Sequence, residues 1–229
     1  MRREDTDVLA IRACSILRLV VRLSKLDCHP ERSEDLVHCK KNPLARGSFR
    51  GIMARSDNFQ IRLASVDDAA LLTELGARLF EQAFGAVNEP ENMRDYLARA
   101  FSVGEQTREL ADSERATFIA VDSNGTPIGY AMVRRNRPAA GVDGVAPGEL
   151  QRIYVDNQWH GRGVGDALMS RCVEQAQAWE CDAFWLGVWQ ENPRAIAFYR
   201  RAGFETVGVQ TFTLGRDIQH DFIMARSLP

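Results

Sequence analysis

Three alternate glycines, Gly161, Gly163 and Gly165, form the segment of this chain best suited to bind a ligand. They follow a predicted strand over 149–155 and open a predicted helix over 164–179 whose apolar residues recur at helical spacing. The first turn of a helix presents N–H groups and the positive end of its dipole, and glycines let an anion lie against them. The segment therefore predicts a site for a phosphate-bearing cofactor.

The order of these glycines separates the turn from two other phosphate-binding loops. A Walker loop has Lys and then Ser or Thr after its last glycine, whereas Asp166 and Ala167 follow Gly165. A dinucleotide-binding loop has the order Gly-x-Gly-x-x-Gly, whereas the order here is Gly-x-Gly-x-Gly. A glycine-rich turn can also be a purely structural loop, so a second segment is needed to decide.

The second informative segment covers residues 192–204 and follows a predicted strand over 183–189. Asn192 is a suitable N-cap, and Pro193 suits the first position of a helix. Gly203 suits the end of that helix. A predicted strand, a capped helix and a terminating glycine thus follow the glycine turn along the chain.

Together, the two segments resemble the GCN5-related N-acetyltransferase (GNAT) superfamily. Residues 160–165, His-Gly-Arg-Gly-Val-Gly, are similar to its acyl-CoA pyrophosphate motif. Residues 192–204 are similar to its Asn-x-x-Ala-x-x-Phe-Tyr-x-x-x-Gly-Phe segment. His160 departs from the Gln or Arg that usually begins the first motif, which leaves the backbone amides of the turn intact.

A narrower resemblance concerns the acceptor. Residues 89–101, 185–189 and 212–224 look like the corresponding parts of PaiA-type spermidine/spermine N-acetyltransferases. This resemblance implies an acetyl-CoA-dependent N-acetyltransferase whose acceptor is a primary amine of a small cationic molecule, such as spermidine or spermine. Because acceptor specificity shifts easily on one fold, a protein or peptide, an aminoglycoside, and a non-catalytic acyl-CoA-binding regulator remain alternatives.

The resemblance further implies acetyl-CoA as the cosubstrate, with no metal. The strands over 149–155 and 183–189 are expected to separate and admit the pantetheine arm, which the backbone of the first strand would pair like an added strand. The residues expected to bind the cofactor are Ile153, Tyr154, Val155, His160, Gly161, Arg162, Gly163, Val164, Gly165, Asp166, Asn192, Tyr199 and Arg200.

Two residues are candidates for the proton transfers of acetyl transfer. The acceptor amine must lose a proton before it attacks, and Glu149 at the start of the central strand could accept it directly or through water. The resemblance implies that Tyr199 is the general acid that protonates the departing thiolate, and a phenol is neutral at pH 7. A backbone N–H near Val155 could stabilise the oxyanion. No cysteine lies in either motif, and direct attack in a ternary complex needs none.

A small cationic acceptor requires carboxylates along a groove and aromatic walls for its methylene groups. The candidates are the carboxylates Glu89, Glu91, Asp95 and Asp156 and the aromatic side chains Phe80, Phe84 and Trp189. Residues 53–229 carry 18 Lys and Arg against 24 Asp and Glu, whereas residues 1–52 carry 11 against 7. An acidic domain suits a cationic acceptor and argues against nucleic acid as a partner.

The order of elements predicts one mixed α/β domain over residues 53–229, with a GNAT fold: a central twisted sheet of about seven strands with helices on both faces. Strands are expected over 60–63, 117–121, 128–134, 149–155, 183–189, 206–213 and 219–226. Helices are expected over 66–84, 91–101, 105–112, 164–179 and 193–202. The two closing strands could pair across a homodimer interface.

Residues 1–52 show no clear alternation of strands and helices and take no part in the resemblance. We expect either a disordered N-terminal extension or an upstream start codon, with Met53 as the natural start. No run of 18 apolar residues occurs, so no membrane partner is expected. Arg and Lys interrupt the apolar stretch over 8–26, so it does not read as a secretory signal, and a cytoplasmic location is expected.

Overall fold

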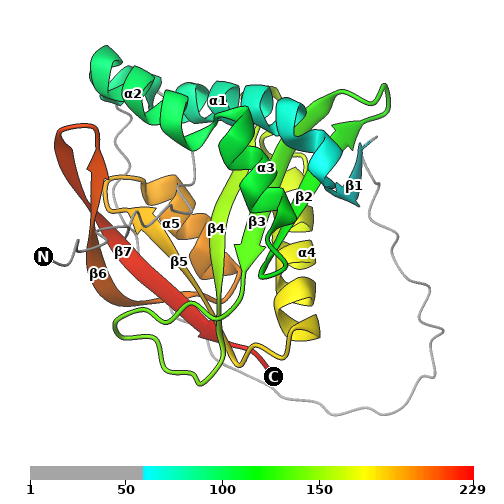
Figure 1. Cartoon of the computed structure of the whole chain (residues 1–229). Coiled ribbons are helices and arrows are strands. Elements are labelled where there is room, and N and C mark those ends of the chain that lie inside the picture. Colours follow the sequence, from blue (N-terminus) through cyan, green and yellow to red (C-terminus); the bar gives the residue numbers. More distant parts are fainter. Residues whose placement is uncertain (1–58) are drawn as a thin grey trace, which may run out of the picture. The chain divides into compact units, whose positions relative to one another are not determined.

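The computed structural model describes residues 59–229, so the expectations for residues 1–52 lie outside the described part of the chain. The described residues contain one seven-stranded sheet in the order β1-β2-β3-β4-β5-β7-β6 (Figure 1). Its strands are β1 (Phe59–Leu63), β2 (Arg115–Asp122), β3 (Pro127–Arg134), β4 (Pro147–Val155), β5 (Ala183–Trp189), β6 (Glu205–Leu214) and β7 (Asp217–Ser227). The sheet is mixed because β4 and β5 run parallel while the other neighbouring strands run antiparallel. The predicted α/β class with about seven strands is confirmed.

Helices cover both faces of this sheet, as the element order predicts (Figure 1). One face carries α1 (Ala69–Phe84), α2 (Pro90–Ala100) and α3 (Val103–Ala111), and the other carries α4 (Val164–Ala178) and α5 (Pro193–Arg201). The helix predicted over 66–84 begins with a 3-10 turn, η1 (Val66–Asp68), and two further 3-10 helices were not predicted: η2 (Gly85–Val87) and η3 (Asn157–Trp159). A single turn is too short to produce a periodic apolar pattern.

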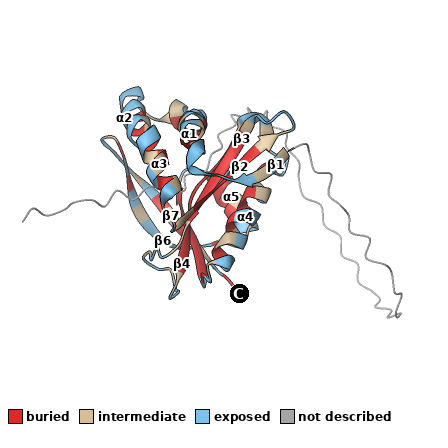
Figure 2. Cartoon of the chain, turned by 45° about the vertical axis from the view of Figure 1, so that its right-hand side comes forward, coloured by how far each residue is buried: buried red, intermediate tan, exposed pale blue. Residues whose placement is uncertain are grey.

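The two faces of the sheet bury separate apolar clusters because successive residues of a strand point to opposite faces. On β4, Leu150 and Ile153 belong to the cluster that includes α4 and α5, whereas Tyr154 belongs to the cluster that includes α1 and α2. Phe80 of α1 is fully buried, with its ring centroid 6.2 Å from that of Tyr154. In Figure 2, buried residues line the strands and the inward faces of the helices, so apolar burial holds both helix layers to the sheet.

β4 and β5 pair along only part of their length. Their register joins residues 147–149 to residues 183–185. On the other side of β4, the register with β3 shifts between Met132 and Val133, so that Gln151 is an extra residue in β4. A bulge of this kind bends a strand and increases its twist. β4 and β5 therefore stop pairing beyond Glu149, and the predicted separation of the two strands is confirmed.

The closing strands predicted over 206–213 and 219–226 correspond to β6 and β7, with β6 at the edge of the sheet. A homodimer contact through them stays a prediction. None of the helices within residues 59–229 has both the length and the apolar character that a membrane crossing requires. In the same part of the chain, no three His, Cys, Asp or Glu side chains gather into a potential metal site.

Candidate active site

The glycine turn adopts a backbone conformation that residues with a side chain rarely adopt. Gly161 and Gly163 have φ angles of 74° and 83°, in the left-handed region that favours glycine. A Cβ atom at either position would meet no other atom within 4 Å, so the surface of the turn is open. Gly163 is also the N-cap of α4, and the N–H groups of the first helical turn have no acceptor within the helix. The turn therefore has the geometry of an anion-binding site.

A cavity of about 230 Å³ lies beside this turn. Its walls come from the end of β4, the turn itself and one face of α5. The lining residues are Ile153, Val155, Trp159, His160, Gly161, Gly163, Gly165, Asp166, Arg194, Ala195, Phe198 and Arg201. Two guanidinium groups and an open helix N-terminus thus border one cavity, which suits a ligand with several negative charges.

Seven of the thirteen residues predicted to bind the cofactor line this cavity, and six do not: Tyr154, Arg162, Val164, Asn192, Tyr199 and Arg200. Tyr154 points to the opposite face of the sheet, into the cluster that includes α1. Val164 is fully buried in the other apolar cluster. The guanidinium of Arg162 lies 5.2 Å from the ring centroid of Trp159, and Arg200 is exposed and not among the lining residues.

Arg194, Phe198 and Arg201 line the cavity although they are not among the residues predicted to bind the cofactor. Their spacing of four and three residues places them on one face of α5, while Arg200 is rotated by about 100° from its neighbour. This spacing would predict all three residues if it were known which face of α5 is turned toward the glycine turn.

His160 connects the end of β4 to the glycine turn. Its Nε2 atom lies 2.9 Å from the carbonyl oxygen of Val155, which can only accept, so Nε2 carries the donated hydrogen. Burial lowers the pKa of His160 below its usual value, and the positive charge of Arg194 lowers it further, whereas the hydrogen bond to Val155 opposes the change. The imidazole is therefore neutral at pH 7.

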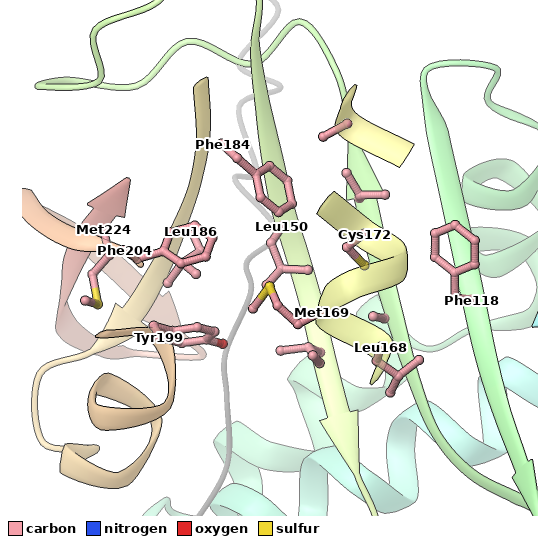
Figure 3. Packing of buried hydrophobic residues seen from close by; sticks show 14 of the residues in the cluster. Phe118, Leu150, Leu168, Met169, Cys172, Phe184, Leu186, Tyr199, Phe204 and Met224 are labelled. Carbon is pink, nitrogen blue, oxygen red and sulfur yellow. The ribbon is translucent and has the colours of Figure 1, made fainter. Parts of the chain in front are cut away.

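Tyr199 lies on the same side of the sheet as this cavity. Its side chain is fully buried in α5, with ring centroids 5.3 Å from Phe198 and 6.0 Å from Phe204. In Figure 3 its phenol oxygen points from α5 toward β4, on the side where Leu150 lies. Asn192 caps the helix, since its Oδ1 atom accepts a hydrogen bond of 3.1 Å from the amide of Ala195.

Glu149 occupies the point where β4 and β5 begin to separate, opposite Trp185 in the parallel register. Its side chain is buried, and the Nε atom of Arg134 donates to its carboxylate over 2.6 Å. Burial raises the pKa of Glu149 above its usual range, and the positive charge of Arg134 opposes this only in part. The carboxyl group is therefore a stronger proton acceptor than an exposed glutamate, although it is engaged in an ion pair.

The carboxylates and rings predicted for acceptor binding do not form one group. Phe80 and Phe84 are buried core residues whose ring centroids lie 4.7 Å apart. Asp156 forms an ion pair with Arg78 and accepts a hydrogen bond from the amide of Gln158, and these contacts lower its pKa against the effect of burial. The remaining carboxylates are exposed at the start and along the outer surface of α2: Glu89, Glu91 and Asp95. Of the predicted aromatic walls, Trp189 alone is half-buried at the end of β5.

A buried polar network beside the β4 bulge was not predicted at all. Arg152 of β4 and Glu109 of α3 form an ion pair of 2.6 Å with both side chains almost completely buried. Arg115 of β2 donates to the other oxygen of Glu109 over 3.0 Å and to the side-chain oxygen of Gln151 over 3.1 Å. The network therefore ties α3 to β2 and to the two residues that form the bend in β4.

Three comparisons with known proteins agree with this geometry. The sequence model of the "Acetyltransferase (GNAT) family" matches residues 77–204. The "Uncharacterized N-acetyltransferase Rv2669" of Mycobacterium tuberculosis (strain ATCC 25618 / H37Rv) is 34% identical over 161 residues, which are 70% of this chain and 98% of that protein. The "Aminoglycoside N(6')-acetyltransferase type 1" of Stenotrophomonas maltophilia is 38% identical over 106 residues, which are 44% of this chain and 67% of that protein.

Among solved structures, the fold is similar to that of the PaiA N-acetyltransferase from Thermoplasma acidophilum, solved in complex with coenzyme A. The TM-score is 0.60 at 18% sequence identity, and the match covers 74% of this chain and 99% of the other. At this identity the likeness concerns the arrangement of strands and helices rather than the acceptor.

Proposed function

Because the chain belongs to the acetyltransferase (GNAT) family and is an acetyl-CoA-dependent N-acetyltransferase, we propose that its acceptor is a primary amine of a small polycationic molecule, with a polyamine as the first candidate. One observation carries the proposal: within a domain of acidic composition, the cavity beside the glycine turn adjoins the place where β4 and β5 separate. The resemblance of residues 89–101 and 212–224 to spermidine/spermine N-acetyltransferases supports the choice of acceptor.

The residues of the cavity fit acetyl-CoA. The open surface at Gly161 and Gly163 lets a diphosphate approach the backbone amides of the turn, and Arg194 and Arg201 supply two positive charges beside it. Beyond residue 149 the edge of β4 is not paired with β5, so its backbone can pair with the amides of the pantetheine arm. Acetyl-CoA supplies the acetyl group as a thioester.

We assign the two proton transfers to Glu149 and Tyr199. The ammonium group of the acceptor loses one proton to Glu149, and the amine nitrogen then forms the new C–N bond. As the C–S bond breaks, one proton passes from the phenol of Tyr199 to sulfur, and the second proton that leaves the nitrogen restores the phenol, which gives a neutral amide and a free thiol. Backbone N–H groups near Val155 face the negative charge that develops on the carbonyl oxygen. The raised pKa of Glu149 and the direction of the Tyr199 hydroxyl support these roles.

An aminoglycoside is the second candidate acceptor, because a relative 38% identical over 106 residues is named as an aminoglycoside acetyltransferase. An aminoglycoside resembles a polyamine in the chemical feature on which the proposal depends, because both carry several ammonium groups on one small molecule. A protein N-terminus would present a single ammonium group, so it fits an acidic domain less well.

The proposal is tested by release of the CoA thiol from acetyl-CoA, using the full chain with spermidine, spermine, tobramycin and a peptide with a free N-terminus. Acceptor-dependent release with spermidine or spermine supports a polyamine. Release with tobramycin or the peptide alone discards the polyamine and keeps the enzyme. If the folded protein binds CoA and releases thiol with none of these acceptors, a non-catalytic regulator becomes the better description.

Tyr199→Phe tests the acid role in the same assay. The substitution keeps the buried ring and removes the hydroxyl, so we expect kcat to fall about 100- to 10,000-fold with little change in CoA affinity. Tyr130→Phe is the matched control, since Tyr130 is equally buried but lies in the cluster on the opposite face of the sheet. Equal rates for both variants would remove Tyr199 from the mechanism.

A further inference from the structure

The last residue of β4, Val155, has its backbone groups on the free edge of the strand. The amide N–H of the next residue, Asp156, donates to the carbonyl oxygen of Ile128 on β3 over 2.8 Å. Because the N–H and C=O groups of successive residues in a strand point to alternate sides, those of Val155 point away from β3 and toward the side of β5. β5 pairs with β4 only at residues 147–149. Within residues 59–229, no strand therefore pairs with this side of Val155.

A side chain takes the place of the missing strand at one of these backbone groups. The Nε2 atom of His160 donates to the carbonyl oxygen of Val155 over 2.9 Å. The chain returns to this position through η3, whose N-cap Asp156 accepts a hydrogen bond of 3.0 Å from the amide of Gln158 and forms an ion pair with Arg78 of α1. The imidazole of His160 is half-buried and lines the cavity beside the glycine turn. His160 thus holds the free end of β4 at the wall of that cavity.

The peptide group that carries the N–H of Val155 is held from the opposite side. Its carbonyl belongs to Tyr154, which is paired with Tyr130 of β3. A Cβ atom at Gly129 would lie only 2.7 Å from that carbonyl oxygen, so β3 approaches it closely. Val155 thus lies between two fixed peptide groups, one held by β3 alone and the other by β3 together with His160. The direction of the Val155 N–H therefore depends on both contacts.

We propose that His160 is a positioning residue for acetyl transfer, an inference that rests on the proposed function: by holding the carbonyl of Val155, it directs the N–H of Val155 toward the carbonyl oxygen of the bound thioester. A hydrogen-bond donor stabilises a developing oxyanion best when its direction is fixed before the reaction. A displacement of about 1 Å at such a position can slow a reaction about 100-fold. Nε2 of His160 carries a hydrogen in this tautomer and in the imidazolium ion, so the contact does not depend on the charge of the ring.

The test is the infrared band of the thioester carbonyl in acetyl-CoA, isotope-labelled at the acetyl carbonyl carbon and bound to the full chain. A hydrogen bond to the carbonyl oxygen lowers the frequency of this band. His160→Gln can donate from about the position of Nε2 and is expected to keep the wild-type frequency. His160→Leu has no donor and is expected to shift the band to higher frequency. An unchanged band in His160→Leu overturns the inference, as does an equal shift in His160→Gln.

His160→Asn covers the case in which His160→Leu does not fold. It carries the same amide as His160→Gln on a shorter side chain that does not reach Val155, so its band should shift as in His160→Leu, and a wild-type band would contradict the inference. CoA itself has no acyl carbonyl, and its Kd at a pH of about 7.5 is expected to change less than about threefold in each variant, because no charge is lost there. With an active acceptor, kcat of His160→Leu should fall about 10- to 100-fold. The band needs no acceptor, so the polyamine proposal can fail while this inference stands.

Discussion

His160 is the residue whose charge should respond to an anion in the glycine turn. In the free protein, burial and Arg194 lower its pKa, so it is neutral at pH 7. A bound diphosphate favours the imidazolium form, so binding must raise this pKa and take up a proton. The affinity for the anion therefore increases as the pH falls toward the lowered pKa of the free protein.

We predict that 3′-dephospho-CoA binds about 3- to 10-fold more tightly as the pH falls from about 7.5 to about 6. The dephosphorylated compound is used because a phosphate monoester itself titrates near pH 6 and would obscure the effect. The measurement is titration calorimetry across this pH range. His160→Gln, which cannot be protonated, should show a flat profile, and an unchanged slope in this variant would assign the proton uptake to another group.

At the scale of secondary-structure elements, the buried ion pair between Glu109 and Arg152 holds α3 against the bend in β4. Glu109 accepts hydrogen bonds from Arg152 over 2.6 Å, from Arg115 over 3.0 Å and from Gln106 over 3.1 Å. Removing this carboxylate leaves the fully buried guanidinium of Arg152 without its counter-charge. Loss of one partner of a buried pair is far more costly than loss of an exposed pair.

Glu109→Ala is therefore expected to lower the free energy of unfolding by about 3–5 kcal/mol, measured by urea denaturation of the full chain. Glu105→Ala, in the same helix, removes a carboxylate whose partner Arg108 is largely exposed, and should cost less than about 0.5 kcal/mol. A loss below about 1 kcal/mol for Glu109→Ala would mean that the network does not hold α3 to the sheet.

The same elements show what the sequence can and cannot predict. The strand–turn–helix unit around Gly161–Gly165 could be predicted because the spacing of apolar residues changes from that of a strand to that of a helix across the turn. The structure contains this unit. Glu109 and Arg152 are 43 residues apart in the chain, and no local pattern connects a charge on a helix to a charge on a buried strand. On α5 the family motif drew attention to Arg200, whereas the helix rotation brings Arg194 and Arg201 to the cavity.

At the scale of the whole molecule, the net charge of the domain is opposite in sign to the charge of the arginines that border the cavity. Residues 53–229 carry 18 Lys and Arg against 24 Asp and Glu, yet the cavity beside the glycine turn is bordered by two arginines. An acidic domain attracts a polycation from solution, while the local arginines retain an anionic cofactor. The first effect acts over long distances and is screened by salt, whereas contacts inside the cavity are screened less.

The effect of salt on the KM for the acceptor should therefore increase with the number of positive charges on the acceptor. Raising the ionic strength from about 0.02 to about 0.2 M is expected to raise the KM for spermidine several-fold, with little change in kcat, because the Debye length shortens to about the size of the site. Butylamine, with one charge, should show a much smaller increase in KM under the same conditions. An equal increase for both amines would mean that the acidic surface does not guide the acceptor and that its recognition depends on short-range contacts.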